Sequence, residues 1–204
     1  MKQINEYFWP DADERTAGAI FGEVTRLPIY LKHVTQRRTC IQAGGNVGVY
    51  AQHLADLFKT VITFEPDPEN WECLQRNVTA ANVIAHHAAL GDKLGTVETF
   101  RTDREATNYG ATMVRPASGG VDVMLIDDLR LDGVDFLMLD VEGYELPALR
   151  GAEQTIARCR PVISVELKGL GVHHGFTNSM LNDWILARGY TLAEKVGRDI
   201  IYTP

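Results

Sequence analysis

The fold of this chain is decided by the stretch Thr39-Cys40-Ile41-Gln42-Ala43-Gly44-Gly45-Asn46-Val47-Gly48. Its first half, 39–43, is a short and mostly apolar run, which predicts a buried strand. Three glycines follow within five residues, and apolar residues then recur at helical spacing from Val47 to Leu54. The stretch therefore predicts a strand, a tight glycine turn and a helix that continues to about Phe58, which together open an α/β fold.

Short apolar runs and helical patterns keep alternating beyond this stretch, which is typical of a parallel sheet with helices on its faces. Further strands are predicted at 60–64, 83–88, 95–101, 121–126, 134–139, 161–165, 190–194 and 199–203. Further helices are predicted after the N-capping residue Asp67, at 145–157 and at 178–188. The last two strands are expected to form a terminal hairpin, and residues 102–120 a long polar loop.

Residues 1–38 precede this alternation. They are predicted to be largely helical, with breaks at Pro10 and Pro28, and to cap one end of the sheet. At 204 residues the chain has the size of a single domain. We therefore expect one domain, with a helical cap at 1–38 and a Rossmann-like core at 39–204.

Composition excludes several classes of protein. The formal charge of -7, from 20 Lys+Arg and 27 Asp+Glu, makes nucleic acid an unfavourable partner. Three scattered cysteines (Cys40, Cys73 and Cys159) have neither a disulfide framework nor zinc-ligand spacing. The N-terminus lacks the apolar stretch of a signal peptide, and no apolar run is long enough to span a membrane. We expect a cytoplasmic protein without a membrane partner.

Polar and glycine residues stand at the carboxyl ends of the predicted strands, where open α/β sheets bind their ligands. They are Gly44 to Gly48, Glu65, Asp92, Asp140 with Glu142, and Glu166. A single carboxylate there is often only a helix cap. The series of them predicts a ligand site along this edge of the sheet.

The glycine cluster differs from two common phosphate-binding motifs. It lacks the Lys-Ser/Thr pair of a P-loop, and Asn46 stands where a GxGxxG motif would place its second glycine. Glu65 follows Gly44 by 21 residues, at the end of the next strand. A carboxylate there can accept hydrogen bonds from a ribose diol. The pair predicts a ligand that contains a nucleoside and needs no pyrophosphate.

Several motifs resemble the FkbM-type S-adenosylmethionine-dependent methyltransferases, in order over about residues 39 to 166. They are Ala43-Gly44-Gly45-Asn46-Val47-Gly48, Phe64-Glu65-Pro66-Asp67-Pro68, Asn77-Val78, Ala89-Leu90-Gly91-Asp92, Ile126-Asp127-Asp128-Leu129, Asp140-Val141-Glu142-Gly143-Tyr144-Glu145, Leu149-Arg150-Gly151-Ala152 and Arg160-Pro161-Val162-Ile163-Ser164-Val165-Glu166. The combination of the second and sixth motifs is the most specific part of this resemblance.

The resemblance implies a three-layer sandwich around a mostly parallel seven-stranded sheet. It also implies O-methylation of a hydroxyl on a sugar, a glycan or a natural-product-like molecule, with S-adenosylhomocysteine as the product. The implied cofactor-binding residues are Gln42, Gly44, Gly45, Asn46, Gly48, Glu65, Pro66, Leu90, Gly91, Asp92 and Asp140. The glycine loop would hold the methionine portion, Glu65 the ribose, and residues 90–92 would border the adenine.

Two positions depart from the family pattern. The family usually has an acidic residue where this chain has Gln42, and a lysine where it has Met138. Gln42 can still hydrogen-bond an ammonium group but lacks the charge attraction. Met138 is expected to leave no cation beside Asp140.

An attacking hydroxyl must lose its proton, so the transfer calls for a base. The candidates are Asp140, Glu166, and either His173 or His174 on the loop that follows Glu166. Asp140, Glu142 and Glu166 could instead share a divalent metal ion, because Mg²⁺ and Mn²⁺ prefer oxygen ligands. We do not favour the metal, because one carboxylate per strand end does not fix a coordination geometry.

Two alternatives remain open at this stage. A nicotinamide-dependent oxidoreductase would use a related sheet, but its GxGxxG motif is missing. A noncatalytic cofactor-binding or assembly protein of the same fold would be consistent with the changes at Gln42 and Met138.

Overall fold

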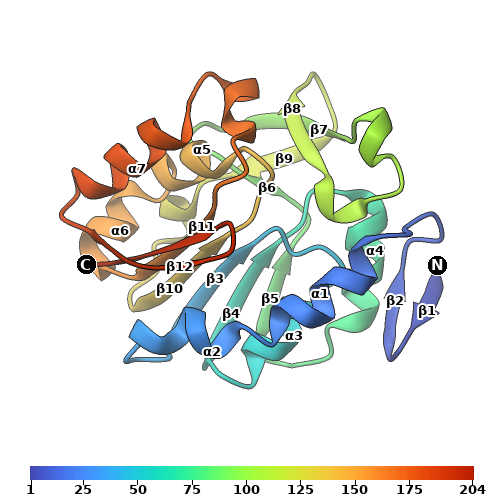
Figure 1. Ribbon diagram of the computed structural model, residues 1–204, viewed down its shortest axis with the longest axis horizontal. Helices are drawn as coiled ribbons and strands as arrows, with labels where there is room; N and C mark the ends of the chain where they lie inside the picture. Colours follow the sequence, from blue (N-terminus) through green and yellow to red (C-terminus); the bar gives the residue numbers. More distant parts are fainter.

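The computed structural model describes residues 1–204, with the side chain of Asp103 outside the description. A seven-stranded sheet runs through its centre in the order β12-β13-β11-β10-β3-β4-β5 (Figure 1). Its parallel strands are β3 (Thr39–Ala43), β4 (Thr60–Phe64), β5 (Val83–His86), β10 (Val134–Leu139) and β11 (Val162–Glu166). At one edge, β12 (Thr191–Val196) and β13 (Asp199–Thr203) form an antiparallel hairpin. The predicted mostly parallel sheet and terminal hairpin are both confirmed.

Helices cover both faces of this sheet and make it the middle of three layers. One face carries α5 (Glu145–Arg150), α6 (Glu153–Cys159) and α7 (Asn178–Leu186). The other carries α1 (Thr16–Val24), α2 (Leu27–Tyr30), α3 (Val49–Ala55) and α4 (Pro68–Asn77). This arrangement is the expected Rossmann-like sandwich.

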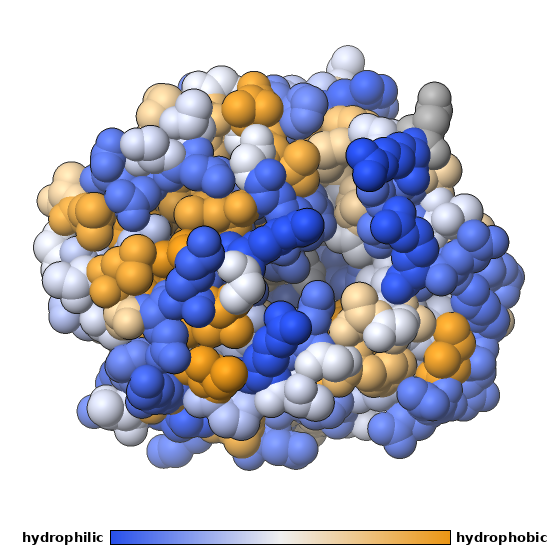
Figure 2. Space-filling view, in the orientation of Figure 1, coloured by the Kyte–Doolittle hydropathy of each residue, from blue (hydrophilic) through white to orange (hydrophobic). Residues whose placement is uncertain are grey.

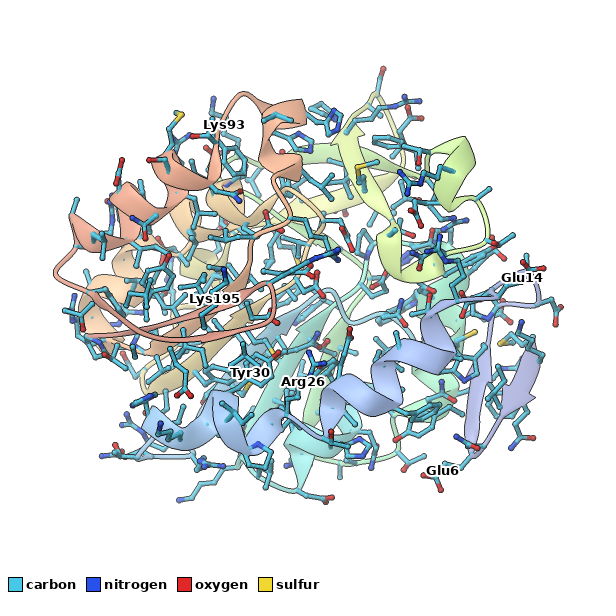
Figure 3. All side chains as sticks on the ribbon, in the orientation of Figure 1. Glu6, Glu14, Arg26, Tyr30, Lys93 and Lys195 are labelled. Atoms are coloured by element: carbon cyan, nitrogen blue, oxygen red, sulfur yellow. The ribbon has the colours of Figure 1, made fainter. Side chains whose placement is uncertain are left out.

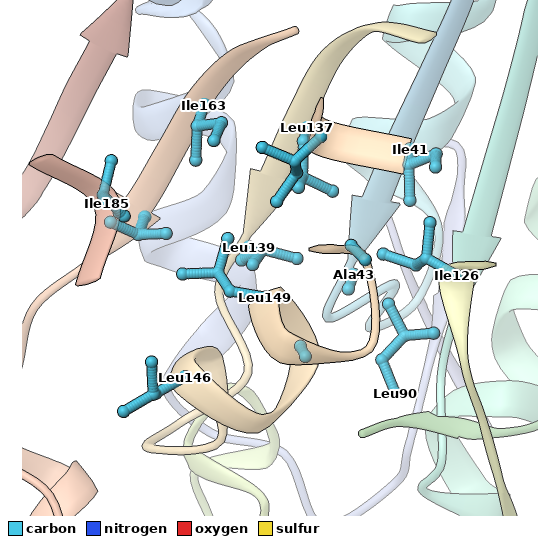
Figure 4. Packing of buried hydrophobic residues seen from close by; sticks show 14 of the residues in the cluster. Ile41, Ala43, Leu90, Ile126, Leu137, Leu139, Leu146, Leu149, Ile163 and Ile185 are labelled. Atoms are coloured by element: carbon cyan, nitrogen blue, oxygen red, sulfur yellow. The ribbon is translucent and has the colours of Figure 1, made fainter. Parts of the chain in front are cut away.

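The strand sequences explain the two apolar layers. Side chains alternate across a sheet, so Leu137 and Leu139 of β10 face α5 while Phe136 and Met138 face the opposite layer. Figure 4 shows Leu139 beside Leu149 of α5, with Leu137 in the same cluster. Strands buried on both faces need continuous apolar runs, which is why the run at 134–139 predicted its strand correctly.

The prediction for the N-terminal segment is wrong over its first nine residues. Strands β1 (Lys2–Ile4) and β2 (Tyr7–Trp9) form a hairpin that packs on α4. Asn77 of α4 accepts from the backbone N–H of Phe8 at 2.7 Å and donates to its carbonyl oxygen at 2.8 Å. The predicted break at Pro28 is present: α1 ends at Val24 and α2 begins at Leu27, with Pro28 in its first turn, where a missing N–H costs nothing.

A second sheet and a divided helix were not predicted. The short strands β6 (Ala89–Leu90), β7 (Gly95–Phe100), β8 (Met113–Pro116) and β9 (Val121–Met124) form a four-stranded sheet, so β8 lies inside the expected loop. The helix expected at 145–157 ends at Gly151. A Cβ there would lie 1.9 Å from the carbonyl oxygen of Gly91, so only glycine allows this approach. None of the described helices is long and apolar enough to cross a bilayer.

Candidate functional site

A cavity of about 950 Å³ opens where the parallel strands end. Its floor is formed by residues that follow β3, β4, β10 and β11, as the sequence predicted. Its walls come from the α1 region, residues 102–114 and the turn at 197–199, which joins the edge strands β12 and β13. Figure 2 shows the hollow near the middle of this face, bordered mainly by hydrophilic residues.

The glycine cluster serves two purposes. Gly44 lines the cavity with φ +84°, and a Cβ on it would lie 1.9 Å from the carbonyl oxygen of Asp140, so it lets the loop pass close to the end of β10. Gly45 and Gly48 face Leu74 of α4 instead and do not line the cavity. These two glycines pack the glycine loop against α4. Instead of contacting a cofactor, as predicted, they would only position the loop that does.

Glu65 joins the loop to the same cavity. The backbone N–H of Asn46 donates to its Oε2 at 2.6 Å, and that of Asp67 donates to its Oε1 at 2.8 Å. The side chain is buried, and this burial raises the pKa of Glu65 to about 8. Because Asn46 and Glu65 both line the cavity, the predicted neighbourhood of the glycine loop and this carboxylate is present.

A roof over this end of the cavity is formed around Tyr109, which the sequence analysis did not single out. The carbonyl oxygen of Tyr109 accepts from Nδ2 of Asn46 at 3.3 Å and of Asn70 at 3.1 Å. Its phenol donates to Glu69 at 3.0 Å, and Arg101 lies 3.7 Å above its ring. The available signal was a tyrosine in a mostly polar loop.

Asn46, Asn70 and Asp140 each line the cavity with a buried oxygen that has no hydrogen-bond partner among the described residues. These atoms are Asn46 Oδ1, Asn70 Oδ1 and Asp140 Oδ1. Each can only accept, and a buried acceptor without a donor is costly; Asp140 Oδ1 has only an ion-pair contact with Lys168, at 3.8 Å. A ligand that brings hydroxyl, amine or ammonium donors fits this set, and S-adenosylmethionine carries all three.

The carboxylates Asp140, Glu142 and Glu166 surround Lys168. Its Nζ lies 2.5 Å from Glu142 Oε1, 2.6 Å from Glu166 Oε2 and 3.8 Å from Asp140 Oδ1. The expectation that Met138 leaves Asp140 without a cation is therefore wrong. Met138 lies in the layer of α1 to α3, and the cation comes from the segment after β11.

Burial and the neighbouring Asp140 raise the pKa values of Glu142 and Glu166, while the three carboxylates raise the pKa of Lys168 against its own burial. One oxygen from each carboxylate lies within 4.8 Å of the others, a spacing that a divalent ion could bridge. In the structure the ammonium group makes these contacts.

The remaining predicted site residues divide between the cavity and its support. Pro66, Leu90 and His173 line the cavity. Those that do not line it are Gln42, Gly91, Asp92 and His174. Gln42 is buried, accepts from Thr63 Oγ1 at 2.6 Å and donates to the carbonyl oxygen of Gly44 at 2.8 Å.

The other three also have partners outside the cavity. A Cβ on Gly91 would meet Val123 and Tyr144. Asp92 lies 3.9 Å from Arg150, and His174 packs edge-on against Tyr144, with a centroid separation of 4.8 Å.

Comparisons with known proteins agree with this geometry. The sequence profile of the Methyltransferase FkbM domain matches residues 42–192. "Methyltransferase 1" of Beauveria bassiana (strain ARSEF 2860) is 26% identical over 143 aligned positions, which cover 55% of this chain and 57% of that protein.

Two solved structures share the fold. The crystal structure of methyltransferase FkbM from Methylobacillus flagellatus KT has a TM-score of 0.56 at 21% identity, over 82% of this chain and 44% of that chain. The precorrin-6y C5,15-methyltransferase of Geobacter metallireducens GS-15 has a TM-score of 0.51 at 11% identity, over 97% and 93% of the two chains. The chain thus spans about half the length of the curated relative and of the first of these structures.

Proposed function

The chain belongs to the FkbM methyltransferase family, and from that premise we propose that it methylates a hydroxyl oxygen of a small molecule, using S-adenosylmethionine. The proposed acceptors are sugars, glycans and natural-product-like compounds. The observation that carries the proposal is the shared cavity of the glycine loop and Glu65, with buried oxygens that lack donors. A donor-rich nucleoside with an amino-acid tail satisfies these atoms.

The chain offers distinct groups for the two ends of this cofactor. Glu65 and Asn70 would receive the nucleoside, and Leu90 would border its base. Asn46, expected with the glycine loop at the methionine portion, hydrogen-bonds Glu65 and is therefore assigned to the nucleoside end as well. Gly44 and Asp140 would receive the amino-acid end, at the centre of the sheet edge. When bound, the cofactor supplies a methyl group activated by a positively charged sulfur.

Asp140 is our candidate for the proton acceptor. Its contact with Lys168, at 3.8 Å, is looser than those of Glu142 and Glu166. Its side chain is also 43% exposed, against 5% and 12% for the other two. It is thus the carboxylate most free to turn toward an acceptor hydroxyl, while Lys168 holds the other two. His173, on the cavity wall, is the second candidate.

Cavity size supports a small acceptor. Small-molecule sites occupy roughly 300–1,000 Å³, so about 950 Å³ accommodates a cofactor and a modest acceptor together.

The free cysteines Cys40, Cys73 and Cys159 are consistent with our proposal of a reducing cytoplasm.

Calorimetric titration with S-adenosylhomocysteine, and separately with NADH, tests the cofactor assignment. We expect the first to bind and the second not to bind. Transfer of a labelled methyl group to a panel of hydroxyl compounds then tests the activity. Binding of S-adenosylhomocysteine without transfer to any member would favour a noncatalytic protein, and binding of NADH alone would contradict the proposal.

A further inference from the structure

Two arginines line one corner of the cavity, on the far side of β10 from the glycine loop. Arg26 lies between α1 and α2, and Arg198 lies in the turn between β12 and β13. The two segments meet there, because a Cβ on Gly197 would lie 3.6 Å from Arg26 Nη1. Figure 3 labels Arg26 beside Tyr30, whose phenol donates to Asp199 of the same turn at 2.7 Å.

This corner belongs to the acceptor half of the cavity. Strands β11 and β10 lie between β13 and β3 in the sheet. At the usual strand spacing, β13 is therefore roughly 14 Å from β3 and its glycine loop. The carbonyl oxygen of Arg198 accepts from the backbone N–H of Leu167 at 3.0 Å. Leu167 stands between Glu166 and Lys168, so the turn borders the carboxylate cluster directly.

Both guanidinium groups remain available for a ligand. No ion pair to Arg26 or Arg198 occurs among the described side chains, whereas Arg15, at the other end of α1, is paired with Glu105 at 2.8 Å. Nearby carboxylates are engaged elsewhere: Asp199 accepts from Tyr30, and Glu166 contacts Lys168. Glu23, which is exposed on α1, is the remaining carboxylate of this wall.

We infer that Arg26 and Arg198 bind a carboxylate or phosphate group carried by the methyl acceptor. The inference rests on the proposed function and narrows its acceptors to anionic hydroxyl compounds. A guanidinium group presents parallel N–H donors that match either anion. Two guanidinium groups at one corner repel each other. An anion bound between them would offset this repulsion.

Calorimetry on the full chain loaded with S-adenosylhomocysteine tests the inference. The probes are a neutral hexose, the matching uronic acid and the matching hexose phosphate, which separate carboxylate from phosphate recognition. The variants are Arg26→Gln and Arg198→Gln. Lys195→Gln is the matched control, because it removes one positive charge from the same hairpin at an exposed residue that does not line the cavity.

We expect at least one anionic probe to bind about tenfold more tightly than the hexose. Each arginine variant should bind that probe about 5- to 20-fold more weakly, a modest loss because solvent screens exposed charge pairs. The control variant should bind it with unchanged affinity. Equal binding of all probes, or no binding of either anion, would overturn the inference.

Reduced affinity of the arginine variants for S-adenosylhomocysteine would also overturn it, since the arginines would then hold the cofactor. A protein that fails to bind S-adenosylhomocysteine at all contradicts the proposed function instead. The anion preference of the unloaded protein can still be measured in that case.

Discussion

Asn46 and Glu65 meet across the end of the sheet, where the backbone N–H of the first donates to the carboxylate of the second at 2.6 Å. This contact fixes the glycine loop against the strand that follows it in the chain, and it aims one carboxylate at the cavity. The role of that carboxylate can be measured directly.

Replacement of Glu65 by glutamine is expected to weaken S-adenosylhomocysteine binding by about 10- to 100-fold, because the hydroxyl donors lose a charged acceptor. Calorimetry measures the change, with Glu72→Gln, on the exposed side of α4, as the control. Equal affinities for the two variants would refute the ribose assignment of Glu65.

Cofactor affinity should depend on pH through the same group. Burial raises the pKa of Glu65 to about 8, and hydroxyl donors favour its ionised form. Binding therefore releases a proton below that value, and the affinity should rise between about pH 6 and pH 8 and then level off. Titrations in buffers of different ionisation enthalpy count the released protons. A wild-type affinity that stays constant over this range, or an equal pH dependence in Glu65→Gln, would show that another group is responsible.

Lys168→Met should destabilise the fold by about 2–4 kcal/mol at pH 8, because two largely buried carboxylates lose their cation. The raised pKa values of Glu142 and Glu166 mean that the folded state holds more protons than the unfolded state above about pH 4.5. Stability then falls as pH rises, more steeply in the variant, so the loss should shrink at pH 5. Urea unfolding of the wild type and the variant at pH 8 and at pH 5 measures the free energy lost at each pH.

Lys168→Arg is the control for this experiment, since it keeps the charge and should lose less than about 1 kcal/mol. A loss in Lys168→Met that is the same at pH 5 and pH 8 would point to packing instead of charge.

Gly44→Ala should cost at least about 3 kcal/mol, because the residue has φ +84° and its Cβ would overlap the carbonyl oxygen of Asp140. Gly95→Ala is the control. A Cβ there meets nothing within 4 Å, so its effect should stay within about 0.5 kcal/mol. Thermal unfolding compares the two variants, and similar melting temperatures would mean that the loop can move away from β10.

Asp140→Asn should lower turnover by about 10²–10⁴-fold, the usual contribution of a general base. Its effect on S-adenosylhomocysteine affinity should be about 10- to 100-fold, as for Glu65→Gln, since the ammonium group loses a charged acceptor. Labelled methyl transfer measures the first and calorimetry the second. Asp92→Asn, outside the cavity, serves as the control. Unchanged turnover in Asp140→Asn would assign the base elsewhere, with His173 next.

The main sheet could be predicted because its signals are local. The apolar run at 134–139 matches β10 residue for residue. Asp67, predicted as a helix cap, accepts from the backbone N–H groups of Glu69 and Asn70 at 3.0 Å. Such patterns need only the neighbouring residues, so they can be read without the rest of the fold.

Features that depend on distant segments could not be predicted. Lys168 contacts Asp140 across 28 residues of sequence, and nothing in either motif signals the pairing. The helix predicted at 145–157 is divided at Gly151, which packs against the backbone of Gly91, and Asp127 accepts from the first N–H groups of α6. In each case the decisive partner lies far along the chain.

The separate origin of the cavity's floor and walls has an evolutionary consequence. The groups proposed to bind the methyl donor stand at the ends of the central strands, where any shift would disturb the main sheet, whereas the walls come from α1, residues 102–114 and the turn at 197–199, at the periphery of the fold. A lineage can therefore acquire a new acceptor by changing the walls while it keeps its methyl donor. Paralogues should diverge fastest in those three segments, and exchanging them between paralogues should transfer acceptor choice.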